Sequence, residues 1–390
     1  MASTKKQYGT PVAVFDISSS SIAGAHVLVG NQKDHLPTIL ASHRIMLPPQ
    51  EVLDMKRFVS ESVHGLENVL QQLHAADVHH PSVIELALAS PWYVSQTRTI
   101  VYTKETPFVC TKKLFDRLIA DEVQQVVEQE LNRFGVFGKD GTVVERQVSR
   151  ITLNGYTTAA PFGKKTSSVE IALTITVAPK QIIDQFLQVI HRAYGPVQVT
   201  TTTSVYASFI VARDYFHAGE ECVIVDVGEE VTDIAFAKDN RFLYQHSFPV
   251  GIYGLTQLLV EKQQYDIQEA TVLLEGYRLN KITASARTKI GKAMGEFTEQ
   301  WRRALQEVLD QGHFGFCLPE ICYITSDVRF ETLFSDVIAG DPFIQHTCSR
   351  GKVIPFVLDE EKYASFITSL DQELDVPLAT TALFLARKLA

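Results

Sequence analysis

The chain has 390 residues and a formal net charge of −9, with 45% hydrophobic and 21% charged residues. These proportions are those of ordinary globular proteins, and they exclude both a largely disordered chain and a small scaffold that needs disulfides or a metal to fold. No basic arm or patch stands out, so nucleic acid is not expected as a main partner. No apolar run approaches the roughly 20 residues of a membrane span. Residues 1–10 lack the pattern of a signal peptide, so we expect a cytoplasmic protein that reaches a membrane only through partners.

The first elements in chain order predict the start of a mixed sheet. Short apolar runs indicate strands at Val12–Phe15, Ile22–Val29 and Thr38–Ile45. Apolar residues then recur every three to four positions, or multiples of that, from Met55 to Leu73, which predicts a helix that begins near Pro48.

The next segment has the order of elements of a small domain. Val83–Ala89 is a predicted strand, and Thr97–Thr103 is its predicted hairpin partner. A helical stripe starts at Leu114, and strands follow at Val143–Leu153 and Val169–Val177. The order strand, strand, helix, strand, strand suffices for an α+β domain of its own.

The remaining chain alternates helices and strands. Helices are predicted at Gln181–Tyr194, Val205–Phe216, Asp266–Leu309 and Thr380–Leu389, and strands at Val197–Thr203, Cys222–Asp226, Ile234–Ala237, Arg241–Val250 and Ile321–Thr325. The last helix is too short and too mixed in character to serve as a strong amphipathic membrane anchor.

Two similar units suggest an internal duplication. One buried strand ends at Asp16 before a serine turn, and another ends at Asp226 before a turn that contains Gly228. Such a turn can present backbone N–H groups to a phosphate, and the aspartate can hold a hydrated divalent cation. Two facing units can therefore clamp a nucleotide between two halves of a protein.

These residues resemble the phosphate loops of the actin-like ATPases and, within them, of the bacterial FtsA/PilM family. The family's first loop reads Asp-Ile-Gly-Ser-Ser. Its second reads Asp-Ile-Gly-x-x-Thr-Thr-Asp, followed by a strand and Phe-Pro-Val-Gly-Gly. The matching segments are Asp16-Ile17-Ser18-Ser19-Ser20-Ser21, Asp226-Val227-Gly228-Glu229-Glu230-Val231-Thr232-Asp233 and Phe248-Pro249-Val250-Gly251-Ile252. The resemblance covers nearly the whole chain, and the second loop is its specific part.

The resemblance implies a duplicated actin-like α/β fold of the ribonuclease-H-like type. The first half is expected at 11–81 and 179–217, and the second at 218–390. A small α+β domain, similar to the SHS2 domain of the family, is expected as an insertion at 82–178.

The resemblance also implies a site for ATP and Mg²⁺ between the halves. Asp16 and Asp226 would hold the metal and face each other across one cleft. The residues expected to contact the nucleotide are Asp16, Ser18, Ser19, Ser20, Asp226, Gly228, Glu229, Thr232 and Ser326. No catalytic residue is assigned.

Several departures from the family pattern predict that this site is weakened or lost. Ser18 replaces a loop glycine, and Glu229-Glu230 replaces a Gly-Gly pair. The segment 270–274 lacks the family's Glu and Lys, and Thr325-Ser326-Asp327 replaces Thr-Gly-Gly. The added carboxylates would repel a polyphosphate in a partly desolvated cleft by on the order of several kcal/mol. Mg-ATP binding is therefore expected to be weak or absent.

The function that the resemblance implies is an adaptor rather than an enzyme. A PilM-like protein would bind the cytoplasmic tail of an inner-membrane protein in type IV pilus assembly, peripheral to that membrane. The first alternative is an FtsA-like cell-division protein. A sugar-kinase-like phosphotransferase and a self-associating filament ATPase are further alternatives. We expect partner recognition at the insertion or in the groove between it and the first half.

The cysteines, an aromatic pair and an acidic cluster can each be explained by a structural role or by a functional one. The five cysteines form no C-x-x-C pair, so reduced, buried thiols are expected. Trp92 and Tyr93 are either a partner-binding knob or part of their own core. The acidic residues near Asp121 and Glu128 are either a solvated helix face or a surface for a basic or amphipathic peptide.

Overall fold

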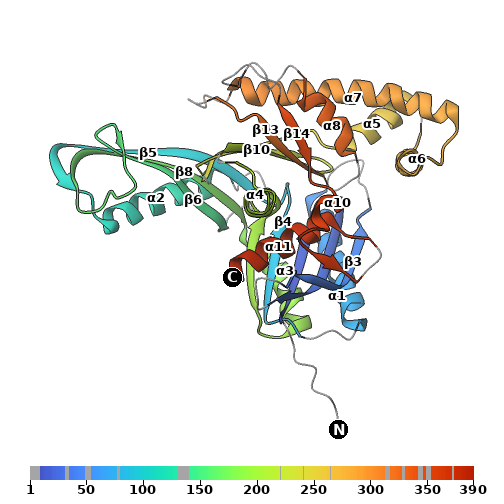
Figure 1. Cartoon of the computed structure of the whole chain (residues 1–390), viewed down its shortest axis with the longest axis horizontal. Helices are drawn as coiled ribbons and strands as arrows, with labels where there is room; N and C mark the ends of the chain where they lie inside the picture. Colours follow the sequence, from blue (N-terminus) through green and yellow to red (C-terminus); the bar gives the residue numbers. More distant parts are fainter. Residues whose placement is uncertain are drawn as a thin grey trace, which may run out of the picture.

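The computed structural model describes thirteen stretches of the chain. They are residues 9–30, 35–48, 54–76, 80–130, 140–219, 221–239, 241–263, 265–311, 317–326, 330–340, 346–347, 353–370 and 373–390. The elements form three sheets with helices packed on them (Figure 1).

The first sheet has six strands in the order β15-β3-β2-β1-β4-β9. They are β1 (Gly9–Ile17), β2 (Ser21–Gly30), β3 (Thr38–Met46), β4 (Val83–Leu88), β9 (Gln198–Thr203) and β15 (Thr368–Ser369). Side chains of β1 alternate between two cores, with Phe15 in one and Val14 in the other. Helices α1 (Met55–Ala75) and α3 (Lys180–Tyr194) supply the core that contains Phe15. The strand is thus buried on both faces, as the apolar run predicts.

The second sheet repeats the pairing of the first. Its order is β12-β11-β10-β13-β14. The strands are β10 (Glu221–Val227), β11 (Thr232–Lys238), β12 (Arg241–Phe248), β13 (Ile321–Ser326) and β14 (Ile354–Val357). In each sheet the central strand runs antiparallel to the strand that follows it and parallel to a later one. The predicted duplication is therefore confirmed.

The remaining helices of the two halves pack on the second sheet, on the first sheet or between the two. They are α4 (Ser204–Tyr215), α5 (Tyr253–Gln263), α6 (Ile267–Arg278), α7 (Ala284–Gln311), α8 (Glu331–Ile338), α10 (Glu360–Tyr363) and α11 (Val376–Leu389). The helical region predicted at Asp266–Leu309 is two helices. Its break follows α6, where Asn280 adopts a φ of 55° and the N–H of Lys281 donates to the carbonyl of Gly276. This left-handed residue ends the helix in the way that favours Asn.

The insertion carries a third sheet in the order β5-β8-β6-β7. Its elements are β5 (Val94–Val109), α2 (Lys112–Glu130), β6 (Gly141–Leu153), β7 (Tyr156–Thr157) and β8 (Lys165–Pro179). The long strands carry this sheet away from the two halves (Figure 1). The predicted hairpin of Val83–Ala89 with Thr97–Thr103 is wrong, because β4 pairs in parallel with β1 and β9. The strands of the insertion begin at Val94, later than the expected boundary at residue 82.

The C-terminal elements complete the first half of the molecule. β15 pairs with β3, and α11 packs against α4 and β1. The expected division placed residues 218–390 in the second half. Residues after 367 instead pack with the first half. The cause is the apolar surface of α11, whose side chains from Leu378 to Ala386 are buried in the same core as Val12 and Val14 of the first sheet.

Two further expectations have separate outcomes. Cys110, Cys222 and Cys322 are free and buried, whereas Cys317 is disulfide-bonded, so the expectation of five reduced thiols is wrong. The spacing of cysteines along the chain does not reveal which of them the fold brings together. Among the helices of the described residues, none is long and apolar enough to cross a membrane.

Candidate functional site

A small cavity lies between the two halves, at the ends of their central strands. Asp16 of β1 and Asp226 of β10 both line it, which confirms that the two aspartates face one cleft. The other lining residues are Ser204, Ser208, Thr325, Ser326, Val376, Pro377, Thr380 and Thr381. The cavity has a volume of about 20 Å³, which is room for about one water molecule. Four of these lining residues, Val376, Pro377, Thr380 and Thr381, belong to the start of α11.

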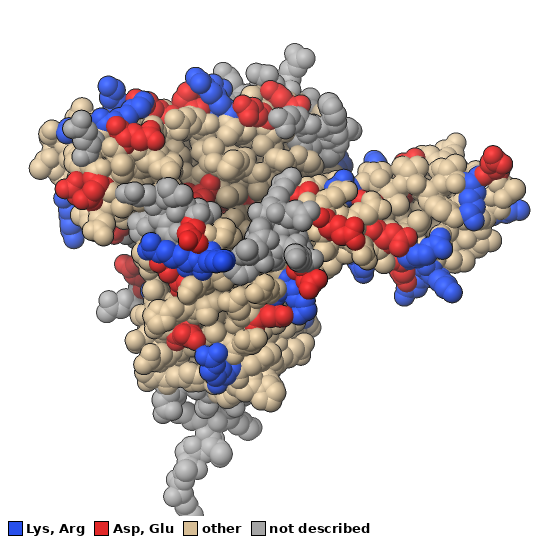
Figure 2. Space-filling view, turned by 180° about the vertical axis from the view of Figure 1, so that it is seen from behind, with Lys and Arg blue, Asp and Glu red and all other residues tan. Residues whose placement is uncertain are grey.

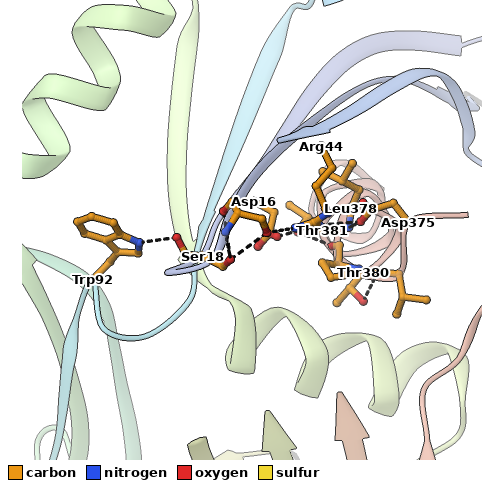
Figure 3. A network of polar contacts seen from close by, with 11 residues as sticks. Asp16, Ser18, Arg44, Trp92, Asp375, Leu378, Thr380 and Thr381 are labelled. Atoms are coloured by element: carbon orange, nitrogen blue, oxygen red, sulfur yellow. Dashed lines mark hydrogen bonds and ion pairs between the residues drawn. The ribbon is translucent and has the colours of Figure 1, made fainter. Parts of the chain in front are cut away.

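The carboxylate of Asp16, which was expected to hold a metal, instead forms an ion pair with Arg44 of β3 (Figure 3). The Arg44 side chain donates through Nη2 to Oδ2 of Asp16 at 3.0 Å, and through Nη1 to Oγ of Ser21 at 2.5 Å. Its Nε and Nη2 donate to the two oxygens of Asp375 at 2.7 and 2.9 Å. The Asp16 side chain is only 2% exposed. A guanidinium thus neutralises this buried carboxylate from within the chain.

Asp375 joins this ion cluster to the start of α11. Its Oδ1 accepts the backbone N–H of Leu378 at 3.0 Å and caps the helix. Burial alone raises the pKa of Asp375, but the charge and hydrogen bonds of Arg44, together with the Leu378 N–H, hold that pKa below its ordinary value. Arg44 therefore fixes the last helix to the central strand of the first sheet.

The first turn is closed on itself. The Ser18 hydroxyl donates to the carbonyl of Ser21 and accepts the backbone N–H of that residue, both at 3.1 Å. The indole N–H of Trp92 donates to the Ser18 carbonyl at 3.2 Å. The hydroxyls of Ser19 and Ser20 are buried and have no hydrogen-bond partner among the described residues. Ser18 is therefore structural, whereas Ser19 and Ser20 keep unused donors at the turn.

The second turn is packed against the segment that follows β12. The carbonyls of Gly228 and Glu229 accept backbone N–H groups of Ile252 and Tyr253. A Cβ on Gly251 would lie 2.3 Å from the Glu229 carbonyl oxygen, so only glycine fits there. Backbone hydrogen bonds from residues 252 and 253 therefore fix the turn at Gly228 and Glu229.

Thr232 was expected to contact a nucleotide, but its hydroxyl is engaged elsewhere. It donates to the carbonyl of Val250 at 2.7 Å and accepts the indole N–H of Trp301 at 3.0 Å. Both Thr232 and Trp301 are fully buried. The residue therefore stabilises the core of the second half and does not line the cavity.

The far wall of the cavity comes from β10 and β13. Thr325 donates its hydroxyl to Oδ1 of Asp226 at 2.7 Å, and Ser326 lines the cavity beside them. Asp327, which was expected near the adenosine, lies outside the described residues. No group of three or more His, Cys, Asp or Glu side chains that could hold a metal occurs in the part of the chain that the structure describes.

These residues do not fit Mg²⁺ and a nucleotide in this conformation. A ligand of that size needs a pocket of about 300–1,000 Å³, far above the 20 Å³ of this cavity. A cation would also have to displace Arg44 from Asp16. The cleft is therefore closed by side chains of the chain itself.

The comparisons with known proteins concern the fold. No family model and no curated protein matches the chain. The solved PilM-PilN type IV pilus biogenesis complex matches with a TM-score of 0.61 at 15% identity over 97% of this chain and 98% of that one. The chain has an actin-like ATPase fold. Ethanolamine utilization protein EutJ from Carboxydothermus hydrogenoformans gives a TM-score of 0.48 at 13% identity, over 96% of this chain and 90% of that one. A Bacteroides thetaiotaomicron protein with an actin-like ATPase fold and unknown function gives 0.46 at 9% identity, over 99% of both chains.

The two halves of the actin-like fold are also joined through Asp233 of β11. Its carboxylate accepts the hydroxyls of Ser90 at 3.0 Å and Tyr93 at 2.7 Å, and also that of Ser247 of β12. Ser90 and Tyr93 belong to the connection between β4 and β5. Burial raises the pKa of Asp233, while the three hydroxyls lower it in part. Tyr93 is thus a cross-half hydrogen-bond donor.

Trp92 packs within its own core. Its ring stacks on Phe58 with the centroids 4.6 Å apart, and its side chain is fully buried. The interpretation of Trp92 and Tyr93 as a partner-binding knob is therefore wrong.

A second carboxylate joins the insertion to the cleft. Glu145 of β6 accepts the Thr202 hydroxyl at 2.8 Å and both the N–H and the hydroxyl of Thr203. Thr203 is the N-cap of α4, and Ser204 of that helix lines the cavity. Burial raises the pKa of Glu145 to about 7. The position of β6 is thus coupled to the start of a helix that lines the cleft.

An open groove lies on the insertion, between α2 and the start of β6. Its volume is about 850 Å³. The lining residues are Ala120, Val123, Gln124, Val127, Glu128, Asp140, Gly141, Val143, Arg146 and Lys180. Ala120, Val123 and Val127 recur at helical spacing and form an apolar wall. Lys180 opens α3 of the first half, so the groove reaches the junction of the insertion with that half.

Arg44 and Asp375 are the cleft residues that the sequence analysis missed. Arg44 is the last of three consecutive polar residues in β3, after Ser42 and His43, and no loop motif includes it. Asp375 had a usable signal, because an Asp before Val376-Pro377 and an apolar run has the pattern of an N-cap with proline in the first turn.

Proposed function

We propose that this chain is an adaptor with an actin-like fold that binds a short segment of a partner in the groove between α2 and β6. The segment is the cytoplasmic tail of an inner-membrane protein, and the process is type IV pilus assembly in the manner of PilM. The chain would then be peripheral to the inner membrane. The groove carries this proposal, because it offers a peptide-sized volume with an apolar wall and charged rims.

The charges around the groove support a peptide ligand rather than an apolar small molecule. Glu128 and Asp140 lie on its rim with Arg146 and Lys180. Such mixed charges fix the register and direction of a bound segment more than they add affinity. The acidic face expected on α2 thus contributes Glu128 to this groove. The PilM-PilN complex, the structure with the TM-score of 0.61, is itself a complex with a partner.

Partner binding can be tested with tail peptides. Synthetic peptides should cover the cytoplasmic tails of single-span membrane proteins encoded beside this gene. We expect one tail to bind the full chain, and Ala120→Glu combined with Val143→Asp to weaken it at least tenfold, which is about 1.4 kcal/mol. The charges would be buried against the apolar wall without partners. Calorimetry measures the affinities.

The matched control is Val272→Asp, which changes another exposed valine, on α6. It should leave tail affinity unchanged. Equal weakening by the control, or tail binding that both groove substitutions leave intact, would contradict the groove as the site.

We expect the cleft of this adaptor to bind Mg-ATP weakly or not at all. Calorimetry with Mg-ATP should show no binding with a micromolar Kd, a Kd that corresponds to a binding free energy of about −8 kcal/mol. The reasons are the Arg44–Asp16 ion pair, the closed cavity and the carboxylates of Glu229 and Glu230. Restoring glycine at Ser18, Glu229 and Asp327 should then recover little affinity while Arg44 stays in place. Micromolar binding by the unaltered chain would show that the cleft opens readily.

A further inference from the structure

The far end of the insertion exposes large apolar side chains. This far end comprises residues 101–117 and 154–168. Tyr156 exposes 80% of its surface, Val101 62%, Val109 50% and Phe162 49%. The fold brings the segments together, since Val109 pairs with Lys165 across β5 and β8.

The aromatic residues there are held in place. Asn154 and Gly155 adopt φ angles of 49° and 81° in the turn between β6 and β7. Oδ1 of Asn154 accepts the backbone N–H groups of Ser167 and Ser168, each at 3.0 Å, which ties the turn to β8. The ring of Phe162 packs edge-on against Phe115 at 5.6 Å. The structure therefore presents these apolar groups outward on a fixed support.

The same segments also carry basic side chains. The exposed cations at the far end are Lys104, Lys112, Lys113, Arg117, Lys164 and Lys165, against the acidic Glu105 and Asp116. None of these six cations forms an ion pair with another residue that the structure describes. Arg98 of the same sheet, by contrast, lies 3.9 Å from Glu122. Blue side chains gather at this end in Figure 2, on a chain whose net charge is −9.

We propose that the far end of the insertion binds the surface of an anionic lipid bilayer. Lysines near an anionic headgroup layer are attracted to its negative potential. Tyr and Phe side chains partition into the interfacial region, where their rings leave water. This contact is independent of the proposed tail groove, which lies nearer the two halves.

The shape and charge of the molecule favour a bilayer over nucleic acid. The insertion projects from the body (Figure 2). A flat bilayer would therefore touch the projecting end, and the rest of this chain, whose net charge is −9 as a whole, would stay away from the anionic surface. A long polyanion would approach the body as well and be repelled by it. The exposed Val101 and Val109 add aliphatic surface, which has no base-edge or phosphate partner in nucleic acid.

Vesicle sedimentation tests the proposal with the full chain. The probes are vesicles of phosphatidylcholine alone and of phosphatidylcholine mixed with phosphatidylglycerol, at low salt. We expect at least about fivefold more protein on the anionic vesicles, with the difference shrinking in high salt. Lys164→Glu with Lys165→Glu should remove most of that binding. Tyr156→Ser with Phe162→Ser should weaken it, and the residual binding should become more salt-sensitive.

The matched control is Lys281→Glu with Lys292→Glu, which makes the same charge change on exposed lysines beside and on α7. It should bind vesicles like the unaltered chain. Equal loss in this control, equal binding to neutral and anionic vesicles, or tighter binding to a single-stranded oligonucleotide than to anionic vesicles would overturn the proposal. Circular dichroism confirms that each variant is folded.

Discussion

Replacing Arg44 by methionine should lower the free energy of unfolding by about 3 kcal/mol. The change would leave the carboxylates of Asp16 and Asp375 close together and without their shared cation. Breaking a buried ion pair by removing one partner costs about 3–5 kcal/mol, because the other charge stays buried and uncompensated. Urea denaturation followed by tryptophan fluorescence measures the loss. Trp92 reports the first half and Trp301 the second.

Two further variants make this result specific. Arg57→Met removes an arginine from an exposed pair with Glu61 on α1 and should cost less than about 1 kcal/mol. Adding Asp16→Asn to Arg44→Met should recover part of the loss, since one orphaned charge is removed. A cost of Arg44→Met no larger than that of Arg57→Met would show that the cluster does not stabilise the closed cleft.

Replacing Asp233 by alanine should cost about 2–4 kcal/mol. The change would leave the hydroxyls of Ser90, Tyr93 and Ser247 without their common acceptor. Each buried group left unsatisfied costs about 1–3 kcal/mol, and some of the three would turn to other partners. Tyr93→Phe removes a single donor and should cost about 1 kcal/mol. Urea denaturation with both tryptophans intact compares these variants.

The pH dependence of this network has a definite sign. Burial raises the pKa of Asp233 in the folded chain. Between its ordinary pKa and the raised one, the folded chain binds more protons than the unfolded chain, so this group makes stability fall as the pH rises. Asp233→Asn should flatten the stability curve in that range. A curve that keeps its slope would assign the slope to other carboxyl groups.

The fold could be predicted where burial leaves a clear pattern. The strands around Asp16 and Asp226 were expected because a short apolar run that ends in a polar turn is typical of a buried strand. The partner of Val83–Leu88 could not be found in this way. A strand of six residues, five of them apolar, shows that it is buried but not whether its neighbours are local in sequence. Both neighbours of β4 are parallel strands from elsewhere in the chain.

The candidate site was predictable as a place but not as a set of contacts. The two loop aspartates do line one cavity, and their assignment to a nucleotide stays a prediction. Local motifs did not reveal that Arg44 lies on Asp16, because the arginine comes from an ordinary strand. The basic end of the insertion was also missed, since its cations come from two segments, 101–117 and 154–168, that are far apart in sequence and that the β5–β8 pairing brings together.

The return of α11 to the first sheet also bears on how the chain is made. The strands that carry Asp16 and Arg44 leave the ribosome early, whereas Asp375 and the helix it caps follow after more than 300 further residues. Until then the face of the first sheet that carries Val14 lacks the helix that covers it. Long-range contacts of this kind slow folding and leave apolar surface open for longer. The N-terminal half of this protein should therefore need protection from aggregation during its synthesis, and it should reach its native packing only once α11 has emerged.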